Sequence, residues 1–244
     1  MRWITTLVLV FVLTGCGADE QGVAGTTGSP TSTVLQFDRE MSKKGCEILT
    51  AELVGATFDV PANALQQMKI MGCRYSWDND EETLEAGISM LRVYDNEAAA
   101  ASWFANATRS KTAEEMKADM EKISEQMDKS EQLDTELKKS TAKNMMSMIG
   151  TNAINFEDVA NIGDEARMND DGTVYVRVGN LTFMVSAYKG PKAPPPEIQG
   201  ADLQQMMEIA KEHSAKWAIE TAPQRRADGV LLARAIAGQF QSLN

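Results

Sequence analysis

The first half of the chain shows a helix pattern followed by a strand pattern. Thr50 stands where a side-chain oxygen can cap a short helix over residues 51–54. Residues 74–77 and 86–94 carry alternating apolar positions on either side of the polar run 78–82. This arrangement is typical of two antiparallel strands joined by a turn.

The composition changes to helix-forming residues after the second of these strands. No Gly or Pro occurs from Ile88 to Ile149, and Asn96 can cap a helix over residues 97–107. Apolar side chains then recur at spacings of three and four, which predicts one apolar face on an amphipathic helix. This stripe consists of Met116, Met120, Ile123 and Met127.

The charged segment 111–149 is long for a body of this size. As one straight helix it would extend about 58 Å at about 1.5 Å per residue, whereas a compact domain of about 200 residues has a radius of gyration near 17 Å. Two arrangements satisfy this constraint. The segment bends near Ser130 and folds back as a helical hairpin, or it projects and presents its stripe to a partner or a second copy.

The second half begins with three predicted strands, at residues 165–169, 173–178 and 181–187. The loops between them, Asn169-Asp170-Asp171-Gly172 and Gly179-Asn180, are rich in residues that accept positive φ angles. We therefore expect an antiparallel meander. Strand alternation places Val174, Val176 and Val178 on one face and Tyr175 and Arg177 on the other.

Two helices are expected near the carboxyl terminus. Pro191 and residues 194–196 predict an extended connector, because proline cannot continue a strand ladder. A helix over 202–219 would then be ended by Pro223, and a last helix would cover 228–240. The predicted fold class is α+β, with an antiparallel sheet built from the hairpin and the meander, packing helices and the long charged helical segment.

Composition and charge narrow the functional classes. The 244 residues are 43% hydrophobic and 24% charged, which fits one ordinary globular domain. The net charge of −11 disfavours nucleic acid as a partner, because it repels phosphate backbones. A single histidine, His213, leaves no basis for a histidine triad or a multi-histidine zinc site.

The amino-terminal residues have the pattern of an export signal. Arg2 gives a positive start, and residues 4–13 form an apolar run that is too short to cross about 30 Å of hydrocarbon as a helix. The run ends in Leu13-Thr14-Gly15-Cys16, which resembles the lipobox of bacterial lipoproteins. This resemblance implies removal of residues 1–15, a diacylglycerol thioether on Cys16 and an acylated new amino group.

The same resemblance implies a location. With Gly17 rather than Asp after the lipidated cysteine, it points to the periplasmic face of the outer membrane in a Gram-negative cell. Gly, Ser, Thr and Ala dominate residues 17–33, so segment 16–33 is expected to be the lipidated cysteine and a flexible tether spanning about 20–25 Å. A single folded domain is then expected at 34–244, with a helical insertion at about 111–149.

Cys46 and Cys73 remain once Cys16 is assigned to lipid. An even pair outside the cytoplasm predicts a disulfide, which would stabilise the fold by about 3.5 kcal/mol in the chain-entropy model. Their separation matches no zinc-finger spacing, and no second Cys or His pair accompanies them. We therefore expect no metal or other cofactor.

The body also resembles, at low density, small secreted or lipid-anchored bacterial domains of unknown function with paired cysteines. The matching segments are Cys46-Glu47-Ile48-Leu49-Thr50, Cys73-Arg74-Tyr75 and Gly163-Asp164-Glu165-Ala166. The resemblance supplies no catalytic residues. On their own chemistry, Asp164 and Glu165 after Gly163 predict a turn entering a strand.

These observations favour a non-catalytic binding or accessory lipoprotein of the cell envelope. Its lipid anchor would attach it to the membrane, and its folded body would bind an envelope protein or a small apolar ligand. Two alternatives remain: an envelope structural or assembly protein acting through its Met-lined helices, and an enzyme whose site the sequence does not reveal. No catalytic residue is predicted.

Overall fold

The computed structural model describes residues 35–69, 72–128, 152–196 and 202–241. The chain divides into two units, 1–33 and 34–244, and every described element belongs to the second. Its helices are η1 (Arg39–Lys43), α1 (Gly45–Ile48), α2 (Ala51–Phe58), η2 (Ala62–Ala64), α3 (Glu97–Ala107), α4 (Ala113–Asp128) and α6 (Leu203–Gln241). Its strands are β1 (Gln66–Met68), β2 (Gly72–Asp78), β3 (Glu82–Val93), β4 (Phe156–Asp158), β5 (Glu165–Asn169), β6 (Val174–Val178) and β7 (Leu181–Pro191).

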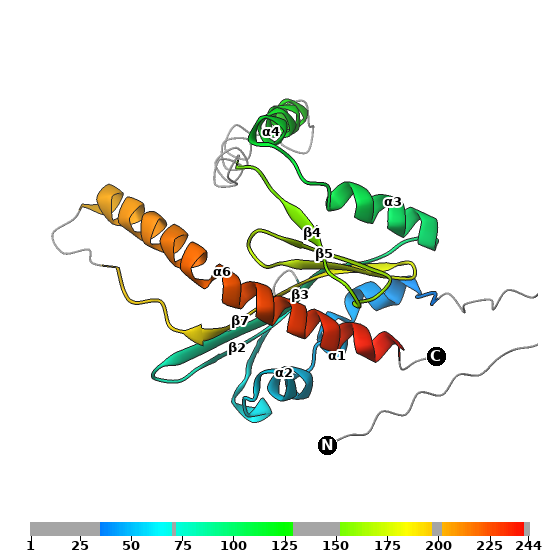
Figure 1. Cartoon of the computed structure of the whole chain (residues 1–244), viewed down its shortest axis with the longest axis horizontal. Helices are drawn as coiled ribbons and strands as arrows, with labels where there is room; N and C mark the ends of the chain where they lie inside the picture. Colours follow the sequence, from blue (N-terminus) through cyan, green and yellow to red (C-terminus); the bar gives the residue numbers. More distant parts are fainter. Residues whose placement is uncertain (1–34, 70–71, 129–151, 197–201, 242–244) are drawn as a thin grey trace, which may run out of the picture. The chain divides into compact units, whose positions relative to one another are not determined.

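All seven strands belong to one antiparallel sheet in the order β1-β2-β3-β7-β6-β5-β4 (Figure 1). The predicted hairpin is β2–β3, and the predicted meander is β5–β6–β7. Strands β3 and β7 pair at the centre and join the two, which confirms the α+β fold with an antiparallel sheet. The edge strands β1 and β4 were not predicted, because three residues are too few to carry a strand pattern.

The inner face of the sheet carries the core. As predicted, Val174, Val176 and Val178 share this face and are buried. Phe183 on β7 packs against Phe240 at the end of α6, with ring centroids 5.9 Å apart. Helices α1, α2 and the carboxyl-terminal half of α6 cover the inner face, while α3 lies on the opposite, outer face.

The predicted disulfide is confirmed. Cys46 in α1 is bonded to Cys73 in β2, with a Cα–Cα distance of 5.0 Å. Cys73 is buried in the core, so the disulfide links α1 to the inner face of the β2–β3 hairpin. The sequence separation of 27 residues makes the loop long enough for the expected stabilisation of about 3.5 kcal/mol.

Thr50 caps α2 as predicted, with its Oγ1 atom accepting a hydrogen bond from the Leu53 amide at 3.2 Å. The helix continues to Phe58, however, so the predicted end at residue 54 was wrong. Burial of Phe58 favours the extra turn, and Asp59 then ends the helix in the left-handed conformation with a φ of 53°. Lys189 Nζ also donates to the Phe58 carbonyl at 2.7 Å, which satisfies the helix terminus.

The prediction of two carboxyl-terminal helices was wrong. Residues 203–241 form one helix, α6, and Pro223 lies inside it. Proline removes one helical hydrogen bond and crowds the carbonyl four residues earlier. Here that carbonyl belongs to Ile219, a strongly exposed residue, so water can satisfy it. Thr221 before the proline and Asp228 after it are both buried, and Asp228 fixes the helix to β7 through the Lys189 amide.

Helix α6 lies along the part of β7 that β6 leaves free. Strand β6 begins at Val174, opposite Val185, whereas β7 continues to Pro191. The Asp228 Oδ2 atom accepts the Lys189 amide hydrogen at 2.6 Å, so the helix satisfies a strand donor that has no strand partner there. This placement brings the amino-terminal half of α6 towards the outer face.

A backbone pairing joins the start of the predicted insertion to the segment that follows it. Lys111 and Ile154 form an isolated antiparallel bridge with backbone hydrogen bonds of 2.9 and 3.0 Å. The chain therefore leaves and returns at one point, with α4 beginning just after it. Ser130, where a bend was one of the two expected arrangements, and the remainder of the segment to Ile149 lie outside the described residues, as do Cys16 and the tether. Among the described helices, none combines the length and apolar character needed to cross a bilayer.

Candidate functional site

A hollow of about 510 Å³ lies between the outer face of the sheet and the middle of α6. It is open on one side, and its size falls within the range of about 300–1,000 Å³ found for small-molecule sites. The residues that line it include Arg74, Gly87, Ser186, Tyr188, Ile219 and Arg225. The turn at 170–173 completes its rim.

The floor of the hollow exists because two small residues meet across the sheet. Gly87 on β3 pairs with Ser186 on β7, and Arg74 on β2 pairs with Gly87 from the other side. A Cβ atom added at Gly87 would lie 3.6 Å from Arg74 Nε, so the guanidinium group extends over the glycine. The next row of the sheet carries the larger Tyr188, which forms one end of the hollow.

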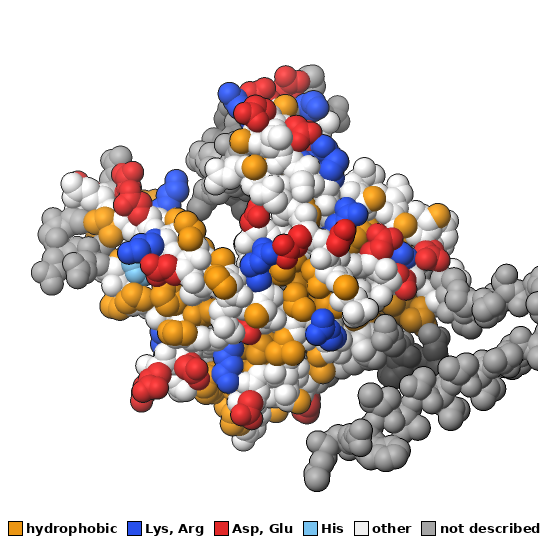
Figure 2. All heavy atoms as spheres, in the orientation of Figure 1, with side chains coloured by type: hydrophobic (Ala, Val, Ile, Leu, Met, Phe, Trp, Pro, Cys, Tyr) orange, Lys and Arg blue, Asp and Glu red, His pale blue; other side chains and the backbone are white. Residues whose placement is uncertain are grey.

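The wall contributed by α6 is apolar. Ala218, Ile219 and Ala222 project from one side of the helix into the hollow, and Ile219 is 75% exposed. Figure 2 shows apolar side chains gathered along α6 and across the region where it crosses the sheet. Large exposed aliphatic groups beside a hollow are typical of a surface that a ligand or partner covers.

Arg225 supplies a positive charge at the Tyr188 end. Its guanidinium carbon lies 4.8 Å from the centroid of the Tyr188 ring, a cation–π contact, and its Nε atom donates to Thr221 Oγ1 at 3.0 Å. Burial raises the pKa of Tyr188 above its ordinary value, although Arg225 counteracts part of this effect. The tyrosine hydroxyl donates to the Pro191 carbonyl at 2.8 Å and remains a neutral, fixed surface.

Asp228 fixes the part of α6 beside the hollow against β7. Its side chain accepts hydrogen bonds from the Lys189 amide and from Gln224 Nε2, the latter at 2.8 Å. Burial raises the pKa of this carboxyl group, and the two hydrogen bonds oppose that rise only in part. The residue is 5% exposed, so it fixes α6 against β7 rather than meeting solvent.

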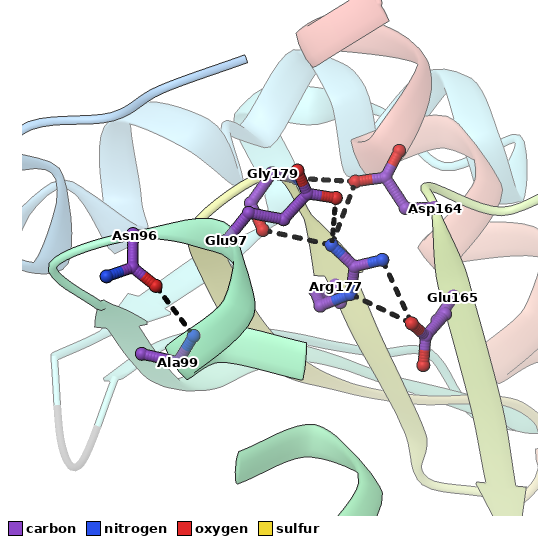
Figure 3. Close-up of polar contacts among 7 residues, drawn as sticks. All are labelled: Asn96, Glu97, Ala99, Asp164, Glu165, Arg177 and Gly179. Carbon is purple, nitrogen blue, oxygen red and sulfur yellow. Dashed lines mark hydrogen bonds and ion pairs between the residues drawn. The ribbon is translucent and has the colours of Figure 1, made fainter. Parts of the chain in front are cut away.

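A buried arginine on the outer face holds a separate polar cluster (Figure 3). Arg177 forms ion pairs with Glu165 at 2.9 Å, Glu97 at 3.1 Å and Asp164 at 3.4 Å. Asp164 also accepts the Gly179 amide hydrogen at 2.6 Å. The cluster therefore connects the first turn of α3 to the entry of β5 and to the turn after β6.

The strand alternation placed Arg177 correctly on the face opposite the valines, but it did not indicate that this side chain is buried. Asp164 and Glu165 do form a turn entering a strand, as expected, and both also pair with the arginine. An arginine among valines, with two acids at the start of the preceding strand, was the available signal. The helix over residues 97–107 was predicted, but its packing over Arg177 was not, because nothing local indicates which sheet face α3 packs on.

The predicted Met stripe lies on α4. Met116, Met120 and Met127 are partly buried, and Ile123 is 45% exposed. Helix α4 is held near its start by ion pairs from Arg109 to Glu115 at 2.7 Å and from Lys111 to Asp119 at 2.8 Å. Hydrogen bonds from these cations lower the pKa of both carboxyl groups.

Within the described residues, no group of three or more His, Cys, Asp or Glu side chains is placed to hold a metal ion. Comparisons of the chain with protein-family descriptions, with curated proteins and with solved structures found no match.

Proposed function

We propose that this protein is a lipid-anchored binding protein of the cell envelope that takes a small ligand into the hollow beside α6. Residues 1–15 would be removed, Cys16 would carry the lipid, and the tether would hold the folded body at the membrane surface. In a Gram-negative cell this places the body on the periplasmic side of the outer membrane. The role is binding rather than catalysis.

The observation that carries the proposal is the hollow with a floor of small side chains and an apolar wall. Gly87 and Ser186 leave room on the outer sheet face beside the larger Arg74 and Tyr188. Ile219 stands exposed at its edge, where a ligand would remove it from water at a gain of about 25 cal/mol per Å² of apolar surface. The lipobox resemblance and the disulfide support a site of action outside the cytoplasm.

Native mass spectrometry of the chain released gently from its own envelope tests the binding role. The wild-type chain should retain an additional small-molecule mass. Ser186→Leu should lose it, because the leucine side chain fills the floor at an exposed position without disturbing the core. Ser102→Leu, at an exposed serine of α3 that does not line the hollow, is the matched control and should retain the mass. An identical spectrum for wild type and Ser186→Leu would contradict the proposal.

The exposure of Ile123 within the stripe favours a second candidate function, docking of α4 to an envelope protein. Ile123→Lys changes this face while leaving the hollow untouched. Loss of an envelope complex with Ile123→Lys, together with full ligand retention, would assign the docking role to α4 as a function separate from the hollow.

A further inference from the structure

We propose that the ligand of the hollow is an anionic amphiphile, with a carboxylate or phosphate head at Arg74 and Arg225 and an apolar body along α6. This inference rests on the proposed binding function and adds the chemistry of the ligand. It follows from how the charged groups around the hollow are already engaged.

The two aspartates of the rim already accept hydrogen bonds, Asp170 from the segment before β4 and Asp171 from the turn itself. Asp170 Oδ2 accepts hydrogen bonds from the backbone and side-chain nitrogens of Asn155, at 2.8 and 3.0 Å. Asp171 Oδ1 accepts the Thr173 amide hydrogen at 2.9 Å. Both residues are exposed at the edge of the hollow, so water screens their charge.

The two arginines carry the positive charge of the hollow, and Arg74 is exposed whereas Arg225 is half-buried. In the part of the chain that the structure describes, neither Arg74 nor Arg225 forms an ion pair with a carboxylate. Arg225 is half-buried and held by Tyr188 and Thr221, so its position is fixed before any ligand arrives. A half-buried cation of this kind is stabilised by an anion, and the planar guanidinium group matches carboxylate and phosphate oxygens in pairs.

The remaining wall requires an apolar body. Ala218, Ile219 and Ala222 offer carbon surface directly beside Arg225, since they lie within seven residues of it on α6. An inorganic anion alone would leave this surface in water, whereas an amphiphile satisfies both features at once. Glu85 is the one other acid of the hollow and is exposed beside Tyr188, so it should weaken an anionic ligand.

Isothermal titration calorimetry with a matched set of dodecyl compounds tests the assignment. The full chain carrying Cys16→Ser is titrated, below the critical micelle concentrations, with dodecanoate, dodecyl phosphate, dodecanol and dodecyltrimethylammonium, and separately with inorganic phosphate. At least one of the two anionic amphiphiles should bind at least tenfold more tightly than the neutral and cationic ones. Inorganic phosphate should bind more than tenfold more weakly than that anion, because it leaves the apolar wall uncovered.

Charge variants then locate the head group. Arg74→Gln and Arg225→Gln should each weaken binding of the anion about tenfold and leave dodecanol unchanged, while Arg225→Lys restores part of the loss and Glu85→Gln strengthens binding. Arg234→Gln, which changes an exposed arginine of α6 outside the hollow, is the matched control and should have no effect. Ser186→Leu should abolish binding of every compound.

The outcomes separate this inference from the function on which it rests. Equal affinity for all head groups, blocked by Ser186→Leu, would overturn the anionic assignment and leave the binding function standing. Anion binding that none of the arginine variants changes would place the head group elsewhere and also overturn the assignment. Absence of binding by every compound, together with no retained mass in the envelope preparation, would overturn both.

Discussion

The side chain of Asn180 hydrogen-bonds to both backbone groups of Phe37, a residue 143 positions earlier in the chain. Its Oδ1 atom accepts the Phe37 amide hydrogen at 2.7 Å, and its Nδ2 atom donates to the Phe37 carbonyl at 3.0 Å. The same amide also donates to the Tyr94 carbonyl at 2.8 Å. One buried side chain thus fixes the start of the body to the β6–β7 turn and to the end of β3.

Asn180→Ala should destabilise the protein by about 2–3 kcal/mol, because it leaves partly buried backbone groups without partners. Urea unfolding measures the loss, and limited trypsin digestion should cut faster after Arg39, next to the released segment. The matched control is Asn106→Ala on the exposed side of α3, expected within about 0.5 kcal/mol of wild type. Equal stability of the two variants would mean that the Asn180 contacts contribute nothing.

Alanine substitution at two glycines of α6 should change the stability of the protein in opposite directions. A Cβ atom at Gly229 would lie 2.4 Å from the Gly172 carbonyl oxygen, so Gly229→Ala must push the helix away from the β5–β6 turn at a loss of about 2 kcal/mol. Gly238 has no atom within 4 Å of such a Cβ, so Gly238→Ala should gain about 0.5–1 kcal/mol through helix propensity. Thermal unfolding measures both, and a gain for Gly229→Ala would contradict the close contact between α6 and the sheet.

The ionisation of Asp228 should make stability depend on pH. Because burial raises the pKa of this carboxyl group in the folded state, the folded chain holds the proton more tightly than the unfolded chain. Its contribution is therefore fully present below the unfolded pKa of about 4, and is lost as the pH rises through the higher folded value. Asp228→Asn removes this dependence.

Urea unfolding of wild type and Asp228→Asn at pH 3.5, 5 and 7 tests this sign. The stability difference between Asp228→Asn and wild type should shift in favour of the variant as the pH rises, because the asparagine is neutral at every pH and can still accept one of the two hydrogen bonds. A difference that stays constant, or that moves in the opposite direction, would show that Asp228 does not titrate as described.

Arg177 should matter more to stability than any one of its acidic partners. Arg177→Leu leaves three carboxylates close together without their cation and should lose about 2–4 kcal/mol. Glu165→Gln leaves two carboxylates and the Gly179 carbonyl on the arginine and should lose less than about 1 kcal/mol. Similar losses for the two substitutions, measured by denaturant unfolding, would contradict the central place of the arginine.

Local signals in the sequence predicted local structure well. Thr50 and Asn96 cap the helices they were expected to cap, and the Gly179-Asn180 turn sets the register that places three valines on the inner face. The disulfide followed from cysteine parity and compartment. In each case the determining residues lie within a few positions of each other, or the argument needs no spatial information.

Features that depend on distant residues were not predicted. Pro223 indicated a helix end, but α6 continues through it, and beyond the proline Asp228 accepts the Lys189 amide hydrogen of β7. The hollow arises only when β3 and β7 pair and bring Gly87 beside Ser186. Neither residue stands out from the strand pattern of its own segment, so no local pattern could have assigned them to a site.

The intact mass of the chain extracted from its native envelope tests the central claim most directly. Our account predicts a detergent-extracted species that lacks residues 1–15, carries a diacylglyceryl group and an amide-linked acyl chain on Cys16, and has Cys46 disulfide-bonded to Cys73. Cys16→Ser should abolish the lipid mass. A full-length, unacylated chain recovered from the cytosolic fraction with free thiols at both positions would contradict it.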